Sequence, residues 1–309
     1  MSKLPLVSII IPVFNTGSNC IKLLERLLES SYQNIEIICV DDGSTDDSFK
    51  QLQDFAKKHE KIVVKKQKNG GASSARNTGI SLARGDFISF IDSDDYVKQD
   101  FIKKLVESFQ DKTTMIASVA LQYNRLAKGE IFNDFMKPVR ERKKHENVID
   151  YVLYLMRIDG RMYGAVTKLF RRDIIEKNEL RFDEKADFAE DTKFVLDYIA
   201  AALPYYKKDS KIIFIYEPLY VYNYGTETST VAKSALKWKN WQQSYAHLKA
   251  WSKKYGGHRA RHRRHVIRLR WRISHALAVA RANISRKEKL KYSNPVELFF
   301  ATILLRFRK

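Results

Sequence analysis

Short apolar runs without polar alternation recur four times in the first 91 residues of this chain. They cover residues 6–11, 35–40, 62–64 and 87–91. Amphipathic helical patterns separate them, at residues 20–28, 47–58 and 72–83. Continuous β-branched runs that alternate with helices are typical of a parallel sheet covered by helices on both faces. The sequence therefore predicts an α/β fold with a mainly parallel central sheet.

Polar residues follow three of these runs, at the points where the strands are predicted to end. Residues 12–15 follow the first run, Asp41 and Asp42 the second, and residues 92–94 the fourth. In parallel sheets with right-handed crossovers, ligands bind beyond the carboxyl ends of the strands. We therefore expect these residues to gather along one edge of the sheet and to form a ligand site.

Three carboxylates stand close together after the fourth run, at Asp92, Asp94 and Asp95. So much negative charge is unfavourable unless a divalent cation binds there. Mg²⁺ and Mn²⁺ take carboxylate oxygens, usually together with phosphate oxygens. The cluster therefore indicates a metal-bridged phosphate site. The alternative is a turn in which an Asp caps a helix that begins near Val97.

Two further turns have a chemical interpretation and a structural one. Asp41 ends an apolar strand, so a turn with Thr45 or Asp46 as helix N-cap does not explain it, and its carboxylate could accept the imide N–H of a uracil ring. Residues 69–77 combine small residues, a helix start and Arg76. That combination suits a pyrophosphate, although an ordinary loop before a helix is the alternative.

Four motifs in this order resemble bacterial family 2 glycosyltransferases, which have the GT-A fold. They are VSIIIPVFN at 7–15, DDGSTD at 41–46, GASSARNTG at 71–79 and FIDSDD at 90–95. A looser similarity extends the resemblance over residues 5–230. It implies a GT-A type, Rossmann-like fold and an enzyme that transfers a sugar from a nucleotide sugar.

The resemblance also implies where the donor binds. Pro12 and Phe14 would line the nucleobase pocket, and Asp41 would bind the uracil edge, so a UDP-sugar is the expected donor. Asp94 would ligate the Mn²⁺ or Mg²⁺ that bridges the diphosphate, and Asp92 would contact the ribose or the metal with its water shell. The other residues expected to border the nucleotide are Asn15, Asn69, Arg76 and Ser93.

Asp191 matches the position of the catalytic base in the inverting members of this family. It would take the proton of an acceptor hydroxyl, and an α-linked donor would then give a β-glycoside. Positioned general bases contribute about 100- to 10,000-fold to such reactions. The alternative is that Asp191 caps a helix at 192–202. Some relatives carry a His shortly after this Glu-Asp pair, whereas residues 193–196 of this chain are Lys, Phe, Val and Leu.

The net charge of +20 is concentrated at the carboxyl-terminal end of the chain. Residues 1–236 carry 36 Lys and Arg against 34 Asp and Glu, whereas residues 237–309 carry 20 against two. We therefore predict a GT-A catalytic domain at 1–236 and a basic, amphipathic helical appendage at 237–309. The catalytic domain would consist of a nucleotide-binding half at 1–112 and an acceptor half at 113–236.

The acceptor half has weaker patterns than the nucleotide half. A strand is predicted at 113–123, a charged loop at 125–147 and a lid over the donor at 226–230. Tyr220, Tyr222 and Tyr224 lie two residues apart, so they would face one side of an extended segment. Packing within a half-buried strand explains such tyrosines more simply than stacking on sugars.

Two basic amphipathic helices are predicted in the appendage, at 258–281 and 295–307. Such helices, with tryptophan and tyrosine nearby, are typical of proteins that bind an anionic membrane surface. We therefore expect a cytoplasmic enzyme that lies peripherally on the inner face of the cell membrane, next to a glycan or lipid-linked acceptor. Alternatively, the apolar faces pack on the catalytic domain or form an oligomer interface. The basic faces could instead be solvated or attract nucleic acid, which is not the expected partner.

The remaining composition limits the compartment and the function. The only cysteines are Cys20 and Cys39, and two buried thiols fit a reducing compartment better than a disulfide. No signal peptide is expected, and no run approaches the ~20 apolar residues that span a bilayer. A nucleotidyltransferase would need a Gly-rich loop with a Lys near the first strand, which residues 12–18 lack. A non-catalytic basic adaptor would not need Asp92, Asp94 and Asp191 together.

Overall fold

The chain forms two compact units in its computed structural model. The first unit comprises Met1–Lys144, Gly164–Glu184 and Asp197–Thr226, and the second comprises His145–Tyr163, Lys185–Leu196 and Glu227–Lys309. The predicted division after residue 236 stays a prediction. The residues that the structure describes are 4–125, 130–134, 137–143, 145–158, 161–186, 189–206, 210–224, 238–257, 260–261, 263–264 and 267–268.

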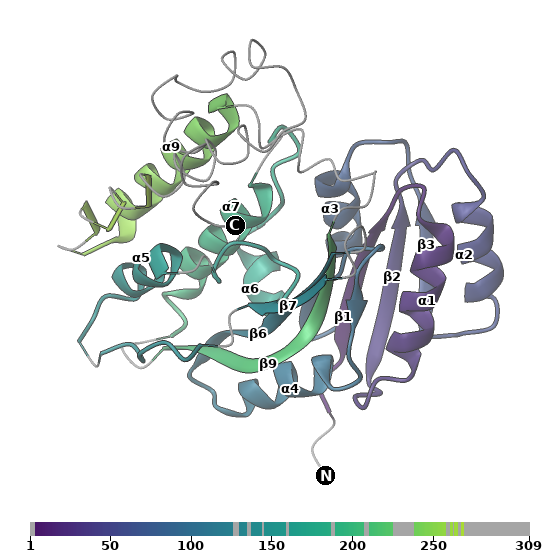
Figure 1. Cartoon of the computed structure of the whole chain (residues 1–309), viewed down its shortest axis with the longest axis horizontal. Helices are drawn as coiled ribbons and strands as arrows, with labels where there is room; N and C mark the ends of the chain where they lie inside the picture. The colour runs from purple at the N-terminus through teal and green to yellow at the C-terminus, as the bar shows by residue number, and fades with distance from the viewer. Residues whose placement is uncertain are drawn as a thin grey trace. The chain divides into compact units, whose positions relative to one another are not determined.

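A nine-stranded sheet is the framework of the first unit, counted over the described residues. Its strands follow the order β3-β2-β1-β4-β8-β6-β9-β5, and β7 pairs with β6. Figure 1 labels β1, β2, β3, β6, β7 and β9. The strands are β1 (Val7–Val13), β2 (Ile35–Asp41), β3 (Ile62–Lys66), β4 (Phe87–Phe90), β5 (Tyr96–Val97), β6 (Thr114–Arg125), β7 (Glu130–Asp134), β8 (Lys168–Arg171) and β9 (Lys211–Tyr224).

The first four strands are parallel, as their continuous apolar sequences predict. β1 lies between β2 and β4, with Val7 opposite both Ile35 and Phe87, and β3 extends the sheet beyond β2. The helices between these strands also lie where the pattern predicts them, at α1 (Gly17–Leu28), α2 (Ser48–Ala56) and α3 (Ala72–Leu82). The N-cap of α2 is Asp47, not the predicted Thr45 or Asp46.

Helices cover both faces of this parallel part. Ile9 and Ile11 of β1 belong to the same core cluster as Leu24 of α1. On the other face, a methyl group at Gly79 of α3 would clash with Cγ2 of Ile10, so only glycine lets α3 pack this closely on β1. Because side chains alternate between the faces of a strand, consecutive isoleucines in β1 pack against helices on opposite faces of the sheet.

A buried carboxylate closes the amino-terminal edge of the parallel strands. Glu36 accepts hydrogen bonds from the Ser8 hydroxyl (2.6 Å) and from the backbone N–H groups of Arg84 (2.7 Å) and Gly85 (3.1 Å), and it forms an ion pair with the Arg84 guanidinium (2.9 Å). Burial by itself raises the pKa of Glu36, but these hydrogen bonds outweigh it and hold the pKa below its usual value. The network ties β1 and β2 to the turn that leads from α3 into β4.

The remaining strands make the sheet mixed. β8 is antiparallel to β4 and β6, β7 to β6, and β5 to β9, whereas β6 and β9 are parallel with irregular register. No helix begins near Val97, because Tyr96–Val97 form strand β5 and α4 (Phe101–Glu107) starts four residues later. Strand β7 also lies inside the segment that we predicted as a loop at 125–147.

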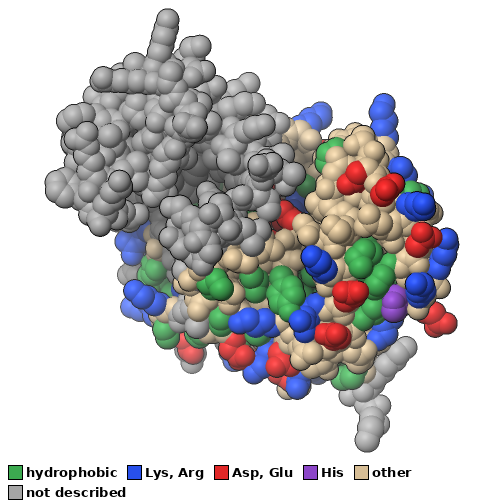
Figure 2. Space-filling model, turned by 45° about the vertical axis from the view of Figure 1, so that its right-hand side comes forward, with side chains coloured by type: hydrophobic (Ala, Val, Ile, Leu, Met, Phe, Trp, Pro, Cys, Tyr) green, Lys and Arg blue, Asp and Glu red, His purple; other side chains and the backbone are tan. Residues whose placement is uncertain are grey.

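The surface and the thiols of the first unit agree with the sequence. Acidic and basic side chains are interspersed over the face of the described residues in Figure 2, as the near balance of charge in 1–236 predicts. Cys20 and Cys39 are buried free thiols, so the expectation of no disulfide is confirmed. Over the described residues, none of the helices combines the length and apolar character that crossing a bilayer requires.

The second unit contains α5 (Val148–Ile158), the start of α7 (Glu190–Ala202) and α9 (Trp238–Tyr255). The indole N–H of Trp251 in α9 donates to the Leu196 carbonyl (2.7 Å), which joins α9 to α7. The Arg263 guanidinium forms an ion pair with Glu146 (3.2 Å) before α5. Residues 260–261, 263–264 and 267–268 are helical, which agrees with the start of the predicted helix at 258–281. The predicted helix at 295–307 and lid at 226–230 lie outside the described residues.

Candidate donor site

The carboxyl ends of β1, β2 and β4 meet at one edge of the sheet, as their parallel arrangement predicts. Val13 pairs with Asp41, and the Asp42 N–H donates to the Val13 carbonyl (2.8 Å). The Ile91 N–H donates to the Ile10 carbonyl (3.1 Å), which brings Asp92, just after the end of β4, next to the carboxyl end of β1. The predicted residues that follow these strands therefore lie together in the first unit.

Residues 14–16 link the turn after β1 to its two neighbours. Asn15 has the left-handed backbone conformation (φ 54°) that asparagine tolerates better than most residues, and its Oδ1 accepts the Thr45 N–H (2.9 Å). The Thr16 hydroxyl shares a hydrogen bond with Ser93 (2.7 Å). Phe14 remains 46% exposed although it precedes these anchored residues, so its ring is free to contact a ligand.

Asp41 has a buried carboxylate oxygen for which the described residues supply no partner. Its Oδ1 accepts the Ser44 N–H (3.1 Å), whereas Oδ2 is buried without a hydrogen bond. Leaving a buried acceptor unsatisfied costs about 1–3 kcal/mol, and more for a charged group. The site therefore favours a donor group that completes the hydrogen bonding of Asp41.

Asp42, which we predicted at this edge without a role in donor binding, has the opposite arrangement. Its Oδ1 accepts hydrogen bonds from the Gln67 amide (2.8 Å) and the Gly70 N–H (2.9 Å), and its Oδ2 accepts the Gly71 N–H (2.7 Å). Asp42 thus holds the loop that leads into α3. No local pattern in the sequence signals this role, because the Gly70 and Gly71 N–H groups come from 28 and 29 residues further along the chain.

The same loop passes close to Asp41. A methyl group at Gly43 would lie 2.9 Å from the backbone nitrogen of Asn69, so the loop crosses the turn after Asp41. Gly43 and Gly71 have positive φ values (76° and 86°), which glycine adopts without strain. The side chain of Asn69 is exposed, so the structure places this predicted residue at the outer rim of the edge.

Arg76 projects from α3 to the residues after β4. Its Nη2 lies 2.7 Å from Oδ1 of Asp92, and its guanidinium lies 5.2 Å from the centre of the Phe182 ring. The Arg76 side chain is only 5% exposed and that of Asp92 is 28% exposed. Arg76 therefore offsets the charge of Asp92, in addition to its predicted contact with the pyrophosphate.

Asn77 is a residue that sequence reasoning missed. Its amide donates to the Phe182 carbonyl (3.0 Å) and the Glu184 carboxylate (2.8 Å), and its Oδ1 accepts the Phe182 N–H (2.8 Å). These bonds fix the segment after β8 beside α3. Asn77 lies inside the GASSARNTG motif, but a motif of small residues does not show which distant segment an amide will bind.

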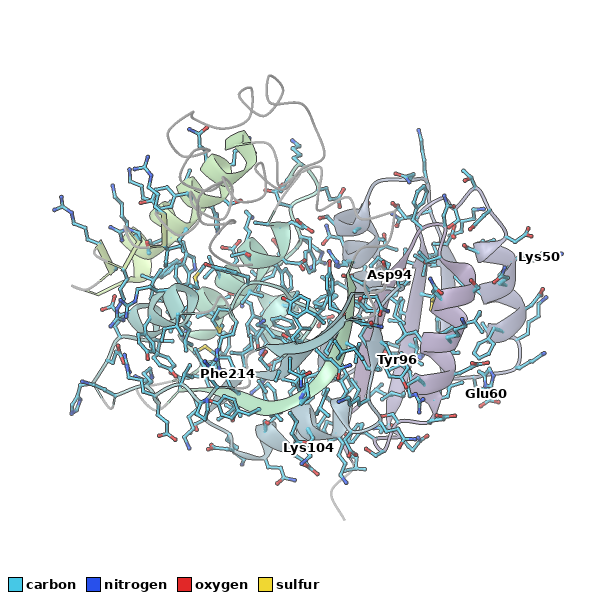
Figure 3. All side chains as sticks on the ribbon, in the orientation of Figure 1. Lys50, Glu60, Asp94, Tyr96, Lys104 and Phe214 are labelled. Atoms are coloured by element: carbon cyan, nitrogen blue, oxygen red, sulfur yellow. The ribbon has the colours of Figure 1, made fainter. Side chains whose placement is uncertain are left out.

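The three carboxylates after β4 have different surroundings. Asp95 is buried and accepts hydrogen bonds from the Tyr220 hydroxyl (2.6 Å) and the Asn223 N–H (2.9 Å). Asp94 is half-buried, and within the described residues no other side chain or N–H group bonds to its carboxylate. Burial and the neighbouring charge of Asp92 raise the pKa of Asp94. Asp94 is labelled in Figure 3.

The described residues offer few carboxylates for a cation at this edge. Among the described residues, no three His, Cys, Asp or Glu side chains form a group that could hold a metal ion. Mg²⁺ is commonly held by one or two carboxylates together with substrate phosphates. The unengaged carboxylate of Asp94, with Asp92 two residues away, fits that kind of shared site.

Asp191 lies in the second unit, in the first turn of α7. The helix begins at Glu190 rather than at the predicted residue 192, so Asp191 is inside the helix and is not its N-cap. Ala189, directly before the helix, has a left-handed backbone (φ 59°), which is costly for alanine. Asp191 is half-buried, and its role as a base stays a prediction.

A cavity of about 460 Å³ lies away from these residues. It is lined by Phe87, at the amino end of β4, and by Thr114, at the amino end of β6. None of the predicted site residues lines it. This cavity and the acidic edge of the sheet therefore lie in different places, and the arrangement of the carboxylates is the better guide to a polar donor that binds at an edge.

A family model described as “Glycosyl transferase family 2” matches residues 8–177. The chain belongs to glycosyl transferase family 2. “Uncharacterized glycosyltransferase EpsJ” of Bacillus subtilis is 32% identical over 236 residues, which are 74% of this chain and 63% of that protein. “Poly(ribitol-phosphate) beta-glucosyltransferase” of Bacillus spizizenii is 29% identical over 197 residues, which are 62% of this chain and 29% of that protein.

Solved structures of glycosyltransferases share the fold of this family 2 chain. S. aureus TarS in complex with UDP-GlcNAc has a TM-score of 0.58 and 20% identity, covering 92% of this chain and 69% of that one. The mannosyltransferase PcManGT from Pyrobaculum calidifontis in complex with GDP-Man and Mn²⁺ has a TM-score of 0.59 and 15% identity, covering 100% and 82%. The predicted GT-A type fold is thus confirmed.

Proposed function

We propose that this chain is an inverting, metal-dependent glycosyltransferase that moves a sugar from a UDP-sugar to a hydroxyl group. The acceptor would be a bacterial cell-surface glycan or a lipid-linked precursor, and the product a β-glycoside. The proposal is carried by the acidic residues at this edge of the sheet. Asp41 keeps one carboxylate oxygen without a partner, and the carboxylate of Asp94 accepts no hydrogen bond from another described residue. The adjacent Asp42 and Asp95 are both held by hydrogen bonds. The relatives support it, because TarS binds UDP-GlcNAc and the mannosyltransferase binds GDP-Man with Mn²⁺.

The uracil ring would bind between Phe14 and Asp41. The exposed ring of Phe14 offers a stacking surface, and Oδ2 of Asp41 would accept the imide N–H of the base. Asp41 is fully buried, so the loop held by Asp42 has to move slightly for the base to reach it. A hydrogen bond to a charged group is worth about 1.5–3 kcal/mol, which would offset that movement.

The diphosphate would lie beside Arg76, Asp92 and Asp94. Arg76 offsets the charge of Asp92 and keeps it from repelling the phosphates. Asp94 and Asp92 would hold a Mn²⁺ or Mg²⁺ ion, which acts as a Lewis acid and offsets the charge that develops on the leaving nucleoside diphosphate.

The acceptor hydroxyl would lose its proton to Asp191 as it attacks the anomeric carbon. The carboxylate of Asp191 then holds that proton, and the bond from the sugar to the diphosphate breaks on the opposite face of the ring. Attack from the face opposite the leaving group inverts the anomeric centre, which gives a β-linkage from an α-linked donor. This role requires the second unit to bring Asp191 to the donor sugar.

Binding measurements with the full chain test the donor class directly. Calorimetry with UDP, UDP-GlcNAc, UDP-glucose and GDP-mannose, each with and without Mn²⁺, should show binding of the uridine nucleotides that strengthens with the ion. Binding of GDP-mannose, with no binding of any uridine nucleotide, would contradict the assignment of Asp41. Absence of any nucleotide binding would overturn the proposal. Full transfer activity in a folded Asp191→Asn enzyme would remove Asp191 as the base.

A peripheral place on the cytoplasmic face of the membrane, through residues 237–309, is part of the same proposal. Each Lys or Arg near an anionic surface contributes about 1 kcal/mol. Full-length protein should co-sediment with vesicles that contain anionic lipid and not with zwitterionic ones. A variant with Arg286, Lys287, Lys289 and Lys291 changed to Gln should bind much less.

The matched control removes the same charge from the surface of the first unit. Lys50, Lys58, Lys65 and Lys103 are exposed, and Lys50 is labelled in Figure 3. Changing these four to Gln should leave vesicle binding nearly unchanged. Equal losses in the two variants would mean that total charge, rather than the appendage, attracts the vesicles.

A further inference from the structure

Strand β9 forms hydrogen bonds with Asp92, Asp94 and Asp95 of the acidic loop after β4. The loop consists of Asp92, Ser93, Asp94 and Asp95, and its partners on β9 are Tyr220 and Asn223. β9 is also paired with β5, which follows the loop directly, with Val97 opposite Tyr220. The loop is therefore attached to a strand that lies more than 120 residues away in the sequence.

Tyr220 joins both ends of the loop through one hydroxyl group. This hydroxyl donates to Oδ2 of Asp95 (2.6 Å) and accepts the backbone N–H of Asp92 (3.3 Å). Tyr220 is fully buried, and its ring packs edge-on against Phe101, with centroids 5.9 Å apart. Water cannot readily replace a hydroxyl in such a place, so the two hydrogen bonds depend on this residue.

Asn223 holds the middle of the loop. Its amide donates to the Asp94 carbonyl (2.6 Å), and its backbone N–H donates to Oδ1 of Asp95 (2.9 Å). Its own Oδ1 accepts a hydrogen bond from Asn124 (3.2 Å), which fixes the orientation of the amide. These bonds reach the backbone of Asp94 and leave its carboxylate unengaged.

We propose that Tyr220 and Asn223 are positioning residues that hold Asp92 and Asp94 in the geometry required by the donor diphosphate and its metal ion. The inference rests on the proposed function. Asp92 and Asp94 carry like charges two residues apart, and their mutual repulsion favours a more open loop. The hydrogen bonds from β9 oppose that opening before the donor arrives, so less ordering is needed on binding.

A matched pair of tyrosines separates positioning from general stability. Tyr198 is also fully buried, and its hydroxyl donates to the Met115 carbonyl (3.2 Å) and accepts the Arg171 N–H (3.0 Å). Its ring packs edge-on against Phe170, with centroids 4.9 Å apart. Tyr198→Phe therefore removes the same chemical group, with its two hydrogen bonds, from a site that is equally buried and contains no proposed donor residue.

The experiment compares Tyr220→Phe, Tyr198→Phe and wild type as full-length proteins. Both variants should lower the melting temperature, Tyr220→Phe by more, because its hydroxyl donates to a carboxylate and that of Tyr198 to a neutral carbonyl. Only Tyr220→Phe should raise the Kd of UDP with Mn²⁺ and the KM of the donor, by about ten-fold, with a smaller change in kcat. Asn223→Ala should act in the same direction as Tyr220→Phe.

Amide hydrogen exchange of the unliganded proteins gives a readout that does not need activity. The Asp92 N–H should exchange faster in Tyr220→Phe than in wild type, whereas Tyr198→Phe should leave it unchanged.

Two results overturn the inference in different ways. Unchanged nucleotide binding in Tyr220→Phe and Asn223→Ala, with wild type binding normally, would show that the contacts with β9 serve only stability. A wild-type protein that binds no nucleotide with Mn²⁺ would instead overturn the proposed function, and this inference with it.

Discussion

Two acidic turns lie at the same edge of the sheet, one after β2 and one after β4, and they divide their carboxylates in the same way. In the first turn, Asp42 is fully engaged by the loop before α3, while Asp41 keeps an oxygen without a partner. In the second, the Asp95 carboxylate accepts hydrogen bonds from β9, while the Asp94 carboxylate accepts none from another described residue. In each turn, one carboxylate holds neighbouring segments in place, and another keeps oxygens available for a ligand. The turn after β4 also contains Asp92, which pairs with Arg76.

The two turns differ in how their unengaged carboxylate is exposed. Asp41 is fully buried, which suits a single directional hydrogen bond to a planar base. Asp94 is half-buried beside Asp92, which suits a cation that also contacts phosphate and water. The comparison predicts that changes at Asp41 and Asp94 alter binding or catalysis, whereas changes at Asp42 and Asp95 alter stability first.

The largest expected effect is at Asp94. Asp94→Asn should lower kcat by about 1,000-fold or more, because the leaving diphosphate loses the charge stabilisation worth several kcal/mol that a bound metal supplies. The melting temperature should stay within about 2 °C of wild type, because no other described residue bonds to this carboxylate. Steady-state kinetics with saturating Mn²⁺ and differential scanning calorimetry measure the two quantities. Near-normal turnover would remove Asp94 from the metal site.

Asp42→Asn should have the next largest effect, and it should appear in stability. One oxygen that accepts a backbone N–H becomes an NH₂ group facing that donor, so the free energy of unfolding should fall by about 2 kcal/mol. Urea unfolding measures this loss. A stability equal to that of wild type would show that the loop before α3 does not depend on Asp42.

Asp41→Asn should have a smaller effect of the opposite kind. The free energy of unfolding should not fall, because Oδ1 can still accept the Ser44 N–H, while UDP binding should weaken about ten-fold. The new amide N–H can donate to the ring nitrogen of cytosine, so the preference for UDP over CDP should shrink. Calorimetry with both nucleotides tests this. An unchanged preference for UDP over CDP would mean that another residue recognises the base.

The smallest effect is expected at Glu36, a structural carboxylate at the opposite edge of the sheet. Its pKa is lowered in the folded protein, so the ionised carboxylate stabilises the fold fully above about pH 4.5, the ordinary pKa of the group. This contribution to the free energy of unfolding is lost as the pH falls through the folded pKa. Glu36→Gln should therefore be less stable than wild type by about 1 kcal/mol at pH 7, and this difference should shrink as the pH falls through the folded pKa. Chemical unfolding at a series of pH values checks this. A difference that does not shrink towards acid pH would contradict the ionised hydrogen-bonding role.

The sequence predicted the parallel part of the fold well, because that part depends on local patterns. Continuous apolar runs specify strands buried on both faces, so β1 to β4 and their parallel arrangement could be predicted from the sequence. The edge of the sheet where Asp41 and Asp92 lie could be predicted with them. The strand at Tyr96–Val97 was missed because two residues carry no periodicity and become a strand only through pairing with β9. β7 was missed for a similar reason, since its segment is rich in charge and pairs only with β6.

The sequence alone determined the class of fold, the edge that carries the site and the acidic residues gathered there, because these follow from periodicity and from strand direction. Only the tertiary structure decided which carboxylate of each acidic turn is engaged. That choice depends on donors such as the Gly71 N–H and the Tyr220 hydroxyl, which reach Asp42 and Asp95 from segments distant in sequence. Neighbouring aspartates are chemically identical in the chain, and only the hydrogen bonds that surround them after folding make them different.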